Sequence, residues 1–326
     1  MTQVPRHLRI VVGGGMGDCL LHTPFIRHFR KTCLYSRITC VVPNRALELF
    51  DHNPHIDRLI GCEVRMLALW ALPEPDCDIF APFIQTEFTI HPDGALSPGN
   101  GFQIKCRNNP LWLLSDVPIV RQTALRHAIA LEDERLEVIT AREDEEWAAT
   151  FVSECADHPL VLLNRRTSST FKEYPRASWQ AVADSLENGA AVVDIATRED
   201  ALAGVRCVDP RLPLRRTAAL FRRARCVVTI DSFAGHLAAA MGTPAVVIFG
   251  PSNPAVFGHA GNRNIRCAPC EPCYDPAERA CGEPACLTQL PPQLIIEAVS
   301  SELARSRPAR VFGPTIATRI VDVQFF

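Results

Sequence analysis

The chain has 326 residues, of which 47% are hydrophobic and 21% charged, and its formal net charge is −2. This is the composition of a soluble globular protein long enough for two domains, and it excludes a disordered chain. The small net charge gives no global signature of nucleic-acid binding. No uncharged run approaches the roughly 18 apolar residues that span a bilayer, and the N-terminal apolar run is too short for a signal peptide. We expect a cytoplasmic protein with at most peripheral membrane contact and no nucleic-acid partner.

The first half of the chain alternates between strand-like and helix-like segments. Leu8–Val12 predicts a strand, the glycines after it a tight turn, and the amphipathic stretch that ends near Lys31 a helix. Further strands are expected at Arg37–Pro43 and Cys77–Phe83. Residues 91–118 are rich in Pro, Gly and Asn and are expected to form long surface loops. The alternation predicts parallel βαβ units.

The second half repeats this alternation. Apolar runs predict four strands, at Pro159–Asn164, Ala190–Ala196, Arg225–Asp231 and Pro244–Gly250. Helical stretches are expected at about Arg176–Glu187, Arg215–Arg223, Ser232–Met241 and Pro292–Arg305. The acidic stretch Ala130–Trp147 lies at the join and reads as a solvated helix face or a linker.

These patterns predict an α/β protein of two Rossmann-like domains, residues 1–155 and residues 156–326. The second domain would carry a cysteine-rich loop at residues 267–286, then a C-terminal helix and tail. Open parallel sheets bind ligands outside the carboxyl ends of their strands. Two such domains facing a central cleft would suit a transfer between two bound substrates.

The glycine-rich turn GGGMGD, at Gly13–Asp18, is the first candidate binding element. It lacks the spacing of a dinucleotide fingerprint, because Asp18 stands where the third glycine would be, and no acidic residue follows the second strand. We expect a loop in which Gly15 and Gly17 let a substrate approach the backbone, with Asp18 at a helix start. The alternative is that Asp18 only caps that helix.

Two further motifs follow strands of the second half. The loop Asn164–Pro175 brings hydroxyl groups and cations together and suits phosphate oxygens, although its composition also fits an ordinary polar connection. In the segment Thr229–Pro254, a buried strand ends at Asp231 and a helix of small residues begins at once. Its N-terminus is a ready anion site. The alternative is that Asp231 and Ser232 are caps and His236 a core histidine.

Five of the 14 cysteines lie within residues 267–286, and the other nine read as small buried residues. The cluster comprises Cys267, Cys270, Cys273, Cys281 and Cys286. Four thiolates, with Cys267 as the spare, would hold one structural zinc or iron ion on a proline-rich loop. Reduced free thiols or a disulfide are the alternatives.

Taken together, the motifs resemble those of glycosyltransferase family 9, the ADP-heptose:lipopolysaccharide heptosyltransferases and their relatives. The resemblance covers roughly residues 8–300. It rests on four blocks in order: GMGDCLLHTPFIRHFRK, the stretch from Val42 to Ile60 with NPHID, TIDSFAGHLAAAMGTPAVVIFGPSNP, and the cysteine-rich region before PPQLIIEAV. One position departs from the family pattern, because Phe233 stands where a glycine usually follows Asp-Ser.

The resemblance implies a GT-B fold, inversion at the anomeric carbon, a nucleotide-sugar donor such as ADP-heptose, and no catalytic metal. It gives Asp18 the place of the general base. Residues matching the donor site are Thr167, Ser168 and Lys172 for the phosphates, Glu199 for the ribose, Leu212 for the adenine, and Asp231, Ser232 and His236 for a second phosphate-binding element. Phe233 lies in that element, at the position of the usual glycine. The acceptor would be a glycan, a lipid-linked group, a protein or a small molecule. The alternatives are a transferase of the same fold that uses another nucleotide sugar on a protein or small-molecule acceptor, and a non-catalytic scaffold that binds nucleotide sugars.

Overall fold

The computed structural model describes residues 6–83, 88–90, 96–98, 116–155, 158–267, 270–273, 284–305 and 322–325. The chain forms two compact units. Unit 1 comprises Met1–Asn108, Val120–Ile139 and Ile316–Phe326, and unit 2 comprises Asn109–Ile119 and Thr140–Thr315.

These units differ from the predicted domains 1–155 and 156–326 at three places: residues 109–119 and 140–155 belong to unit 2, and residues 316–326 belong to unit 1. The acidic helix α7 (Arg142–Ser153) belongs to unit 2, where Asp144 lies 3.3 Å from Arg215 of α9 (Leu214–Arg223). The segment is therefore a packed helix of unit 2 and not a linker: Asp144 is buried, while Arg142, Glu143 and Glu146 are exposed, as expected of the solvated helix face that was the other reading. At the other end, the last strand β13 (Asp322–Phe325) pairs in parallel with β3 (Arg58–Cys62) of unit 1.

Unit 1 is built on a five-stranded sheet in the order β13-β3-β2-β1-β4, in which every pairing is parallel. Its other strands are β1 (His7–Val11), β2 (Arg37–Pro43) and β4 (Cys77–Phe80). The short helices of this half are α1 (Met16–Leu20), α2 (Thr23–Lys31), η1 (Asn44–Ala46), α3 (Leu47–Phe50), η2 (Val64–Met66), α4 (Leu67–Trp70) and α6 (Ile119–Arg126). Six of the seven residues of β2 are buried, as expected of a central parallel strand.

Two segments of this half differ from the sequence-based prediction. The single helix expected up to Lys31 is interrupted at Leu21 and His22, and α2 restarts at Thr23 with Pro24 in its first turn. Proline has no N–H to continue the preceding helix. The stretch predicted as loops contains β6 (Leu96–Pro98), which pairs antiparallel with β5 (Phe88–Ile90). Residues 91–95 and 99–115 lie outside the described residues.

Unit 2 contains a six-stranded parallel sheet in the order β12-β11-β10-β7-β8-β9. This is the order of the classic Rossmann fold. The strands are β7 (Leu160–Asn164), β8 (Ala191–Ile195), β9 (Arg206–Val208), β10 (Cys226–Ile230), β11 (Ala245–Ile248) and β12 (Arg263–Ile265). The four predicted strands are confirmed within one or two residues at each end, and β9 and β12, of three residues each, were not predicted.

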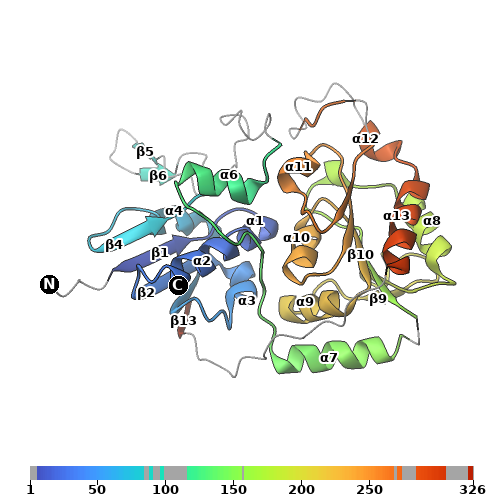
Figure 1. The fold of residues 1–326 in the computed structure, drawn as a ribbon, viewed down its shortest axis with the longest axis horizontal. Helices are drawn as coiled ribbons and strands as arrows, with labels where there is room; N and C mark the ends of the chain where they lie inside the picture. Colours follow the sequence, from blue (N-terminus) through green and yellow to red (C-terminus); the bar gives the residue numbers. More distant parts are fainter. Residues whose placement is uncertain are drawn as a thin grey trace. The chain divides into compact units, whose positions relative to one another are not determined.

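Helices cover both faces of this sheet (Figure 1). On one face, α8 (Arg176–Leu186) and α13 (Pro292–Ala304) pack around a core that contains Trp179 and Ile295. On the other, α10 (Phe233–Ala240) lies close to α9, and a Cβ added at Gly235 would meet Val247 of β11 at 3.5 Å. The remaining short helices are η4 (Thr170–Lys172), α11 (Pro254–Phe257) and α12 (Ala285–Thr288).

Among the residues that the structure describes, no helix is long and apolar enough to cross a bilayer. The cytoplasmic location stays a prediction.

Candidate functional site

The order of the strands in unit 2 singles out one place for a ligand. From β7 the chain adds β8 and β9 on one side, and then continues with β10, β11 and β12 on the other side of β7. The order therefore reverses between β7 and β10. In open parallel sheets the crevice outside the carboxyl ends of the strands at such a switch point is the usual ligand site.

The residues predicted to hold the donor all lie at this carboxyl edge. They follow four neighbouring strands: Thr167, Ser168 and Lys172 after β7, Glu199 after β8, Leu212 after β9, and Asp231, Ser232, Phe233 and His236 after β10. The sheet thus brings together, at one edge, residues that are up to 69 positions apart in the sequence.

Lys172 and Asp231 meet across the switch point. The Nζ of Lys172 donates to Oδ2 of Asp231 at 2.5 Å. The Asp231 side chain is 7% exposed and that of Lys172 30%. Burial by itself would raise the pKa of Asp231, but the charge of Lys172 and hydrogen bonds from Lys172 and Ser252 outweigh it, and the pKa lies below its usual value. Asp231 is therefore a buried carboxylate beside one half-exposed ammonium group.

Hydrogen bonds fix the start of α10 beside this pair. Ser232 occupies the N-cap position with extended backbone geometry. The Oγ of Ser232 lies 3.3 Å from the Oγ1 of Thr229, which also accepts from the Nδ2 of Asn164 at the end of β7. Phe233 is the first residue of the helix. The N-terminus of α10, with its partial positive charge, is thereby positioned at the switch point.

His236, one turn into α10, pairs with a second histidine. Its Nδ1 lies 2.8 Å from the Nε2 of His259, and the two rings meet edge to face. Burial lowers the pKa of His236 to about 4 and that of His259 to about 3. Both rings are therefore neutral at pH 7. No sequence motif pointed to His259, because only the fold brings it to His236.

Two of the three cations in the loop after β7 form ion pairs with aspartates other than Asp231. Arg165 is buried and makes an ion pair with the fully buried Asp194 at 3.0 Å. Arg166 lies 3.0 Å from Asp200 on the surface. Lys172 is the remaining cation of this loop, and it is the one directed at the switch point. The hydroxyl of Thr167 accepts from the backbone N–H of Ser169 at 3.4 Å, and Ser168 is exposed.

Glu199 and Leu212 lie farther along the edge of the sheet. Glu199 is exposed, and hydrogen bonds from its own backbone N–H and from Thr197 lower its pKa. Leu212 is half-buried, and its N–H donates to the carbonyl of Asp209. These contacts do not test whether Glu199 binds the ribose or whether Leu212 borders the adenine, and both roles stay predictions.

In unit 1 the corresponding switch point lies between β1 and β4, and the glycine loop follows β1. Gly14 has φ +91°, and a Cβ there would come within 2.5 Å of Asp18. Oδ2 of Asp18 accepts from the N–H of Gly15, the N-cap of α1, at 2.7 Å. Gly17 is half-buried within α1. Asp18 is therefore not the N-cap of α1 itself, but the third residue of the helix, whose side chain bonds back to the N-cap N–H. Its role as a base stays a prediction.

His22 is a buried group beside this loop that sequence reasoning passed over. Its Nδ1 donates to the carbonyl of Asp18 at 2.9 Å, because that carbonyl only accepts. Its Nε2 is buried and has no hydrogen-bond partner among the described residues, and burial lowers the pKa of the ring to about 4. The ring packs edge to face on Phe83. His22 fixes the joint between α1 and α2 as a neutral ring.

The predicted metal ligands do not come together in the part of the chain that the structure describes. Cys267 and Cys270 are exposed, Cys273 is half-buried, and Cys286 is buried in the core of unit 2. Cys281 lies outside the described residues. Among the described residues, no three His, Cys, Asp or Glu side chains form a group that could hold a metal ion.

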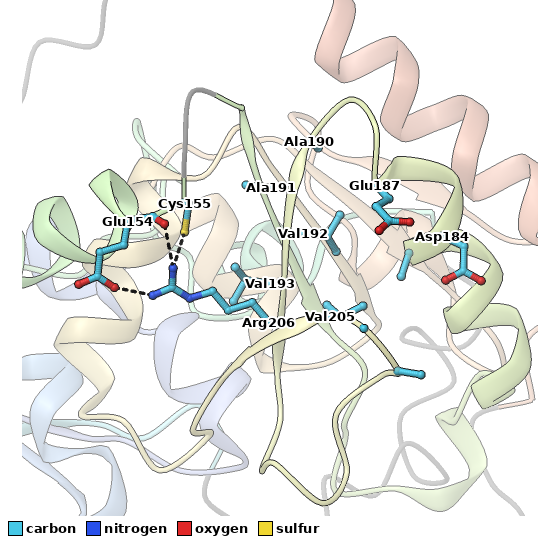
Figure 2. Close-up of a pocket in the computed structure, with 13 residues that line it drawn as sticks. Glu154, Cys155, Asp184, Glu187, Ala190, Ala191, Val192, Val193, Val205 and Arg206 are labelled. Carbon is cyan, nitrogen blue, oxygen red and sulfur yellow. Dashed lines mark hydrogen bonds and ion pairs between the residues drawn. The ribbon is translucent and has the colours of Figure 1, made fainter.

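A separate cavity of about 410 Å³ lies at the opposite edge of the same sheet (Figure 2). It is lined by the first residues of β8, the start of β9 and the end of α8. Arg206 donates to Glu154 at 2.6 Å beside it. Because this is the amino edge of the strands, the cavity is not the ligand site of a Rossmann-type sheet.

Comparison with known proteins agrees with this geometry. A family model described as glycosyltransferase family 9 (heptosyltransferase) matches residues 119–285, just over half of the chain. Lipopolysaccharide heptosyltransferase 1 of Pseudomonas aeruginosa is 32% identical over 171 residues, which is 44% of this chain and 48% of that protein. The alignment thus spans about half the length of this curated relative.

Solved structures match over nearly the whole chain. The family 9 glycosyltransferase of Veillonella parvula has a TM-score of 0.69 and 18% identity and covers 94% of this chain and 99% of its own. The E. coli ADP-heptose lipopolysaccharide heptosyltransferase II has a TM-score of 0.61 and 17% identity, with 91% and 98% covered. The iron-containing dodecameric heptosyltransferase TibC, in complex with ADP-D-beta-D-heptose, has a TM-score of 0.61 and 15% identity, with 91% and 76% covered.

The structural matches confirm the predicted GT-B fold. The family model adds the family to the fold, because it matches the segment that contains β7, β10 and the residues that lie at their carboxyl ends. The chain belongs to glycosyltransferase family 9.

Proposed function

We propose that this protein is an inverting glycosyltransferase that moves a heptose from ADP-heptose onto an acceptor hydroxyl. The observation that carries the proposal is the Lys172–Asp231 pair at the switch point of unit 2, in a chain that belongs to a heptosyltransferase family. The names of its relatives support the choice of donor, since one is an ADP-heptose enzyme and another is a complex with ADP-D-beta-D-heptose.

The diphosphate of the donor would bind at the N-terminus of α10. Lys172 supplies the positive charge there, and its ion pair with Asp231 fixes where that charge lies. His236 and the hydroxyls of Ser232 and Thr167 would add hydrogen bonds to phosphate oxygens. Glu199 would accept from the ribose hydroxyls, and Leu212 would pack against the adenine. Preorganised donors of this kind stabilise negative charge on a leaving diphosphate.

Asp18 would act as the general base. The acceptor oxygen attacks the anomeric carbon and forms the new glycosidic bond, while the bond from that carbon to the phosphate oxygen breaks and ADP departs. The proton of the acceptor hydroxyl passes to the carboxylate of Asp18. One displacement inverts the anomeric centre. Gly15 and Gly17 would leave room for the acceptor beside the loop.

The acceptor would be a sugar hydroxyl of a lipopolysaccharide core. Support comes from the curated relative in P. aeruginosa, which is a lipopolysaccharide heptosyltransferase. Phe233 favours one alternative, a different nucleotide sugar on a protein or small-molecule acceptor. Phe233 is the first residue of α10, where the family pattern usually has glycine, and its ring would restrict how closely a donor approaches the backbone.

A structural zinc or iron ion would be held by Cys270, Cys273, Cys281 and Cys286. TibC is iron-containing, and C-x2-C spacing suits such ions. In this chain, however, Cys286 packs in the core of unit 2, and the described cysteines form no ligand group. The metal therefore rests on the spacing of the cysteines in the sequence.

Thermal stabilisation tests the donor. A ligand that binds only the folded state, present at 100 times its Kd, stabilises the protein by about 2.7 kcal/mol. ADP and ADP-heptose should raise the melting temperature more than GDP or UDP at the same concentration. A larger shift with another nucleotide would indicate the alternative donor, and no shift with any of them would contradict the proposed site.

A further inference from the structure

We infer that His259 is a positioning residue for the donor site: it holds His236 in the tautomer that donates from Nε2 to the diphosphate. This inference rests on the proposed function, because it takes His236 as a ligand of the donor. His259 belongs to none of the motifs that the chain shares with its family, and its ring contacts that of His236.

The argument begins with the number of protons that the two rings share. Burial keeps both rings neutral at pH 7, so each ring carries one N–H and one bare nitrogen. The Nδ1 of His236 and the Nε2 of His259 are 2.8 Å apart. One of these two nitrogens must donate to the other, because two bare nitrogens would leave buried lone pairs facing each other.

The charge around His236 selects between the two directions. Its second nitrogen, Nε2, lies on the side of the ring away from His259. Under the proposed function the group that Nε2 meets is the diphosphate, which only accepts hydrogen bonds. Of the two charges that act on His236, the carboxylate of Asp231 affects its pKa more than the ammonium group of Lys172, so the net field favours a hydrogen-bond donor over a bare nitrogen. Nε2 of His236 therefore carries the proton, and its Nδ1 is the acceptor. His259 must then donate from its own Nε2.

This arrangement resembles the way a second residue fixes the tautomer of a catalytic or metal-binding histidine. His259 itself is held in place, since the Nδ2 of Asn264 donates to its carbonyl at 3.2 Å. Without the donor at residue 259, His236 could place its single proton on Nδ1 and would present a bare nitrogen to the phosphate oxygens.

The first test is the tautomer itself. Long-range ¹H–¹⁵N NMR of the histidine rings at pH 7, with His236→Gln to assign the signal, reports which nitrogen carries the proton. We expect Nε2–H on His236 and Nε2–H on His259 in the ligand-free protein. A proton on Nδ1 of His236 would overturn the inference, whatever the affinity for ADP.

The second test is ADP affinity measured by calorimetry. His259→Leu removes the donor and should weaken ADP binding roughly tenfold, the scale of one charge-assisted hydrogen bond. His259→Gln keeps an N–H donor near the position of Nε2 and should restore the affinity to within about threefold. If His259 had only a structural role, the Leu and Gln variants would bind ADP equally weakly whenever their melting temperatures were equal. That result would overturn the inference.

The two proposals fail differently. If ADP does not bind the wild-type protein at all, the proposed donor site is wrong. If ADP binds and His236→Ala weakens it, but His259→Leu binds ADP like the wild type, the donor site stands and the role of His259 is wrong.

Discussion

Replacing Lys172 with alanine separates what this residue does for the fold from what it does for the donor. The change leaves Asp231, whose side chain is 7% exposed, without its ammonium partner at 2.5 Å. Breaking a buried ion pair on one side costs about 3–5 kcal/mol. Lys172 is 30% exposed and the hydrogen bond from Ser252 remains, so we expect the free energy of unfolding to fall by about 2–3 kcal/mol.

Arg166→Ala is the matched control. Arg166 lies in the same loop and pairs with Asp200 at 3.0 Å, but the two side chains are 58% and 43% exposed. An exposed pair contributes about 0–1 kcal/mol. Urea denaturation of both variants should therefore show a clear loss for Lys172→Ala and a small one for Arg166→Ala. Equal losses would refute the claim that the Lys172 pair is buried and structurally important.

Binding is measured on the same variants. Lys172→Ala should weaken ADP binding by about 1.5–3 kcal/mol, as for a hydrogen bond to a charged group. The double variant Lys172→Ala with Asp231→Asn removes the unpaired buried charge. It should recover part of the lost stability, and it should also bind ADP more tightly than Lys172→Ala, because it removes a negative charge beside the diphosphate. Unchanged ADP affinity in Lys172→Ala, measured by calorimetry, would exclude its role at the diphosphate.

Three further predictions can be tested on the purified protein. Asp18→Asn should bind ADP normally and lose turnover by a factor on the order of 10² or more, and near-normal turnover would exclude Asp18 as the base. Stability to urea should fall as the pH drops from about 6.5 toward 4, because the pKa of His22 is about 4 in the folded protein against 6.5 when unfolded, so the unfolded chain takes up the proton first. His22→Gln should make this decline shallower and leave the profile above pH 6.5 unchanged, and an identical slope would contradict the assigned pKa. If four thiolates bind a metal, elemental analysis should find about one zinc or iron ion per chain. Cys270→Ser should then lower both the metal content and the melting temperature. A metal-free protein of full stability would contradict the proposed metal site.

The sequence predicted the parts of the fold that have strong local patterns. Buried strands such as Arg37–Pro43 are continuous apolar runs with β-branched residues, and the structure has that strand with the same bounds. The helix Arg176–Leu186 was predicted with an end only one residue away, because its apolar positions follow the helical period. Asp231 could be singled out because it directly follows a buried strand, and Asp18 and Lys172 because each lies in the glycine-rich or polar loop after a strand; their roles stay predictions.

What the sequence did not predict depends on contacts between distant segments. The strand Asp322–Phe325 is formed by pairing with Arg58–Cys62, and a four-residue segment carries no pattern of its own. The acidic helix Arg142–Ser153 looked solvated because its partners, arginines of α9, lie more than 60 positions away. His259 is a lone histidine in a loop, and its contact with His236 spans 23 positions.

The most direct test of the account is acceptor-dependent release of ADP from ADP-heptose. The purified protein is incubated with ADP-heptose and a lipopolysaccharide core that lacks heptose, and both ADP and the modified core are measured. The account predicts release of ADP in step with heptose transfer by the wild type, with ADP binding but no turnover in Asp18→Asn. Tight binding of ADP-heptose without transfer to any core, protein or small-molecule acceptor would contradict it and would identify the protein as a scaffold that binds nucleotide sugars.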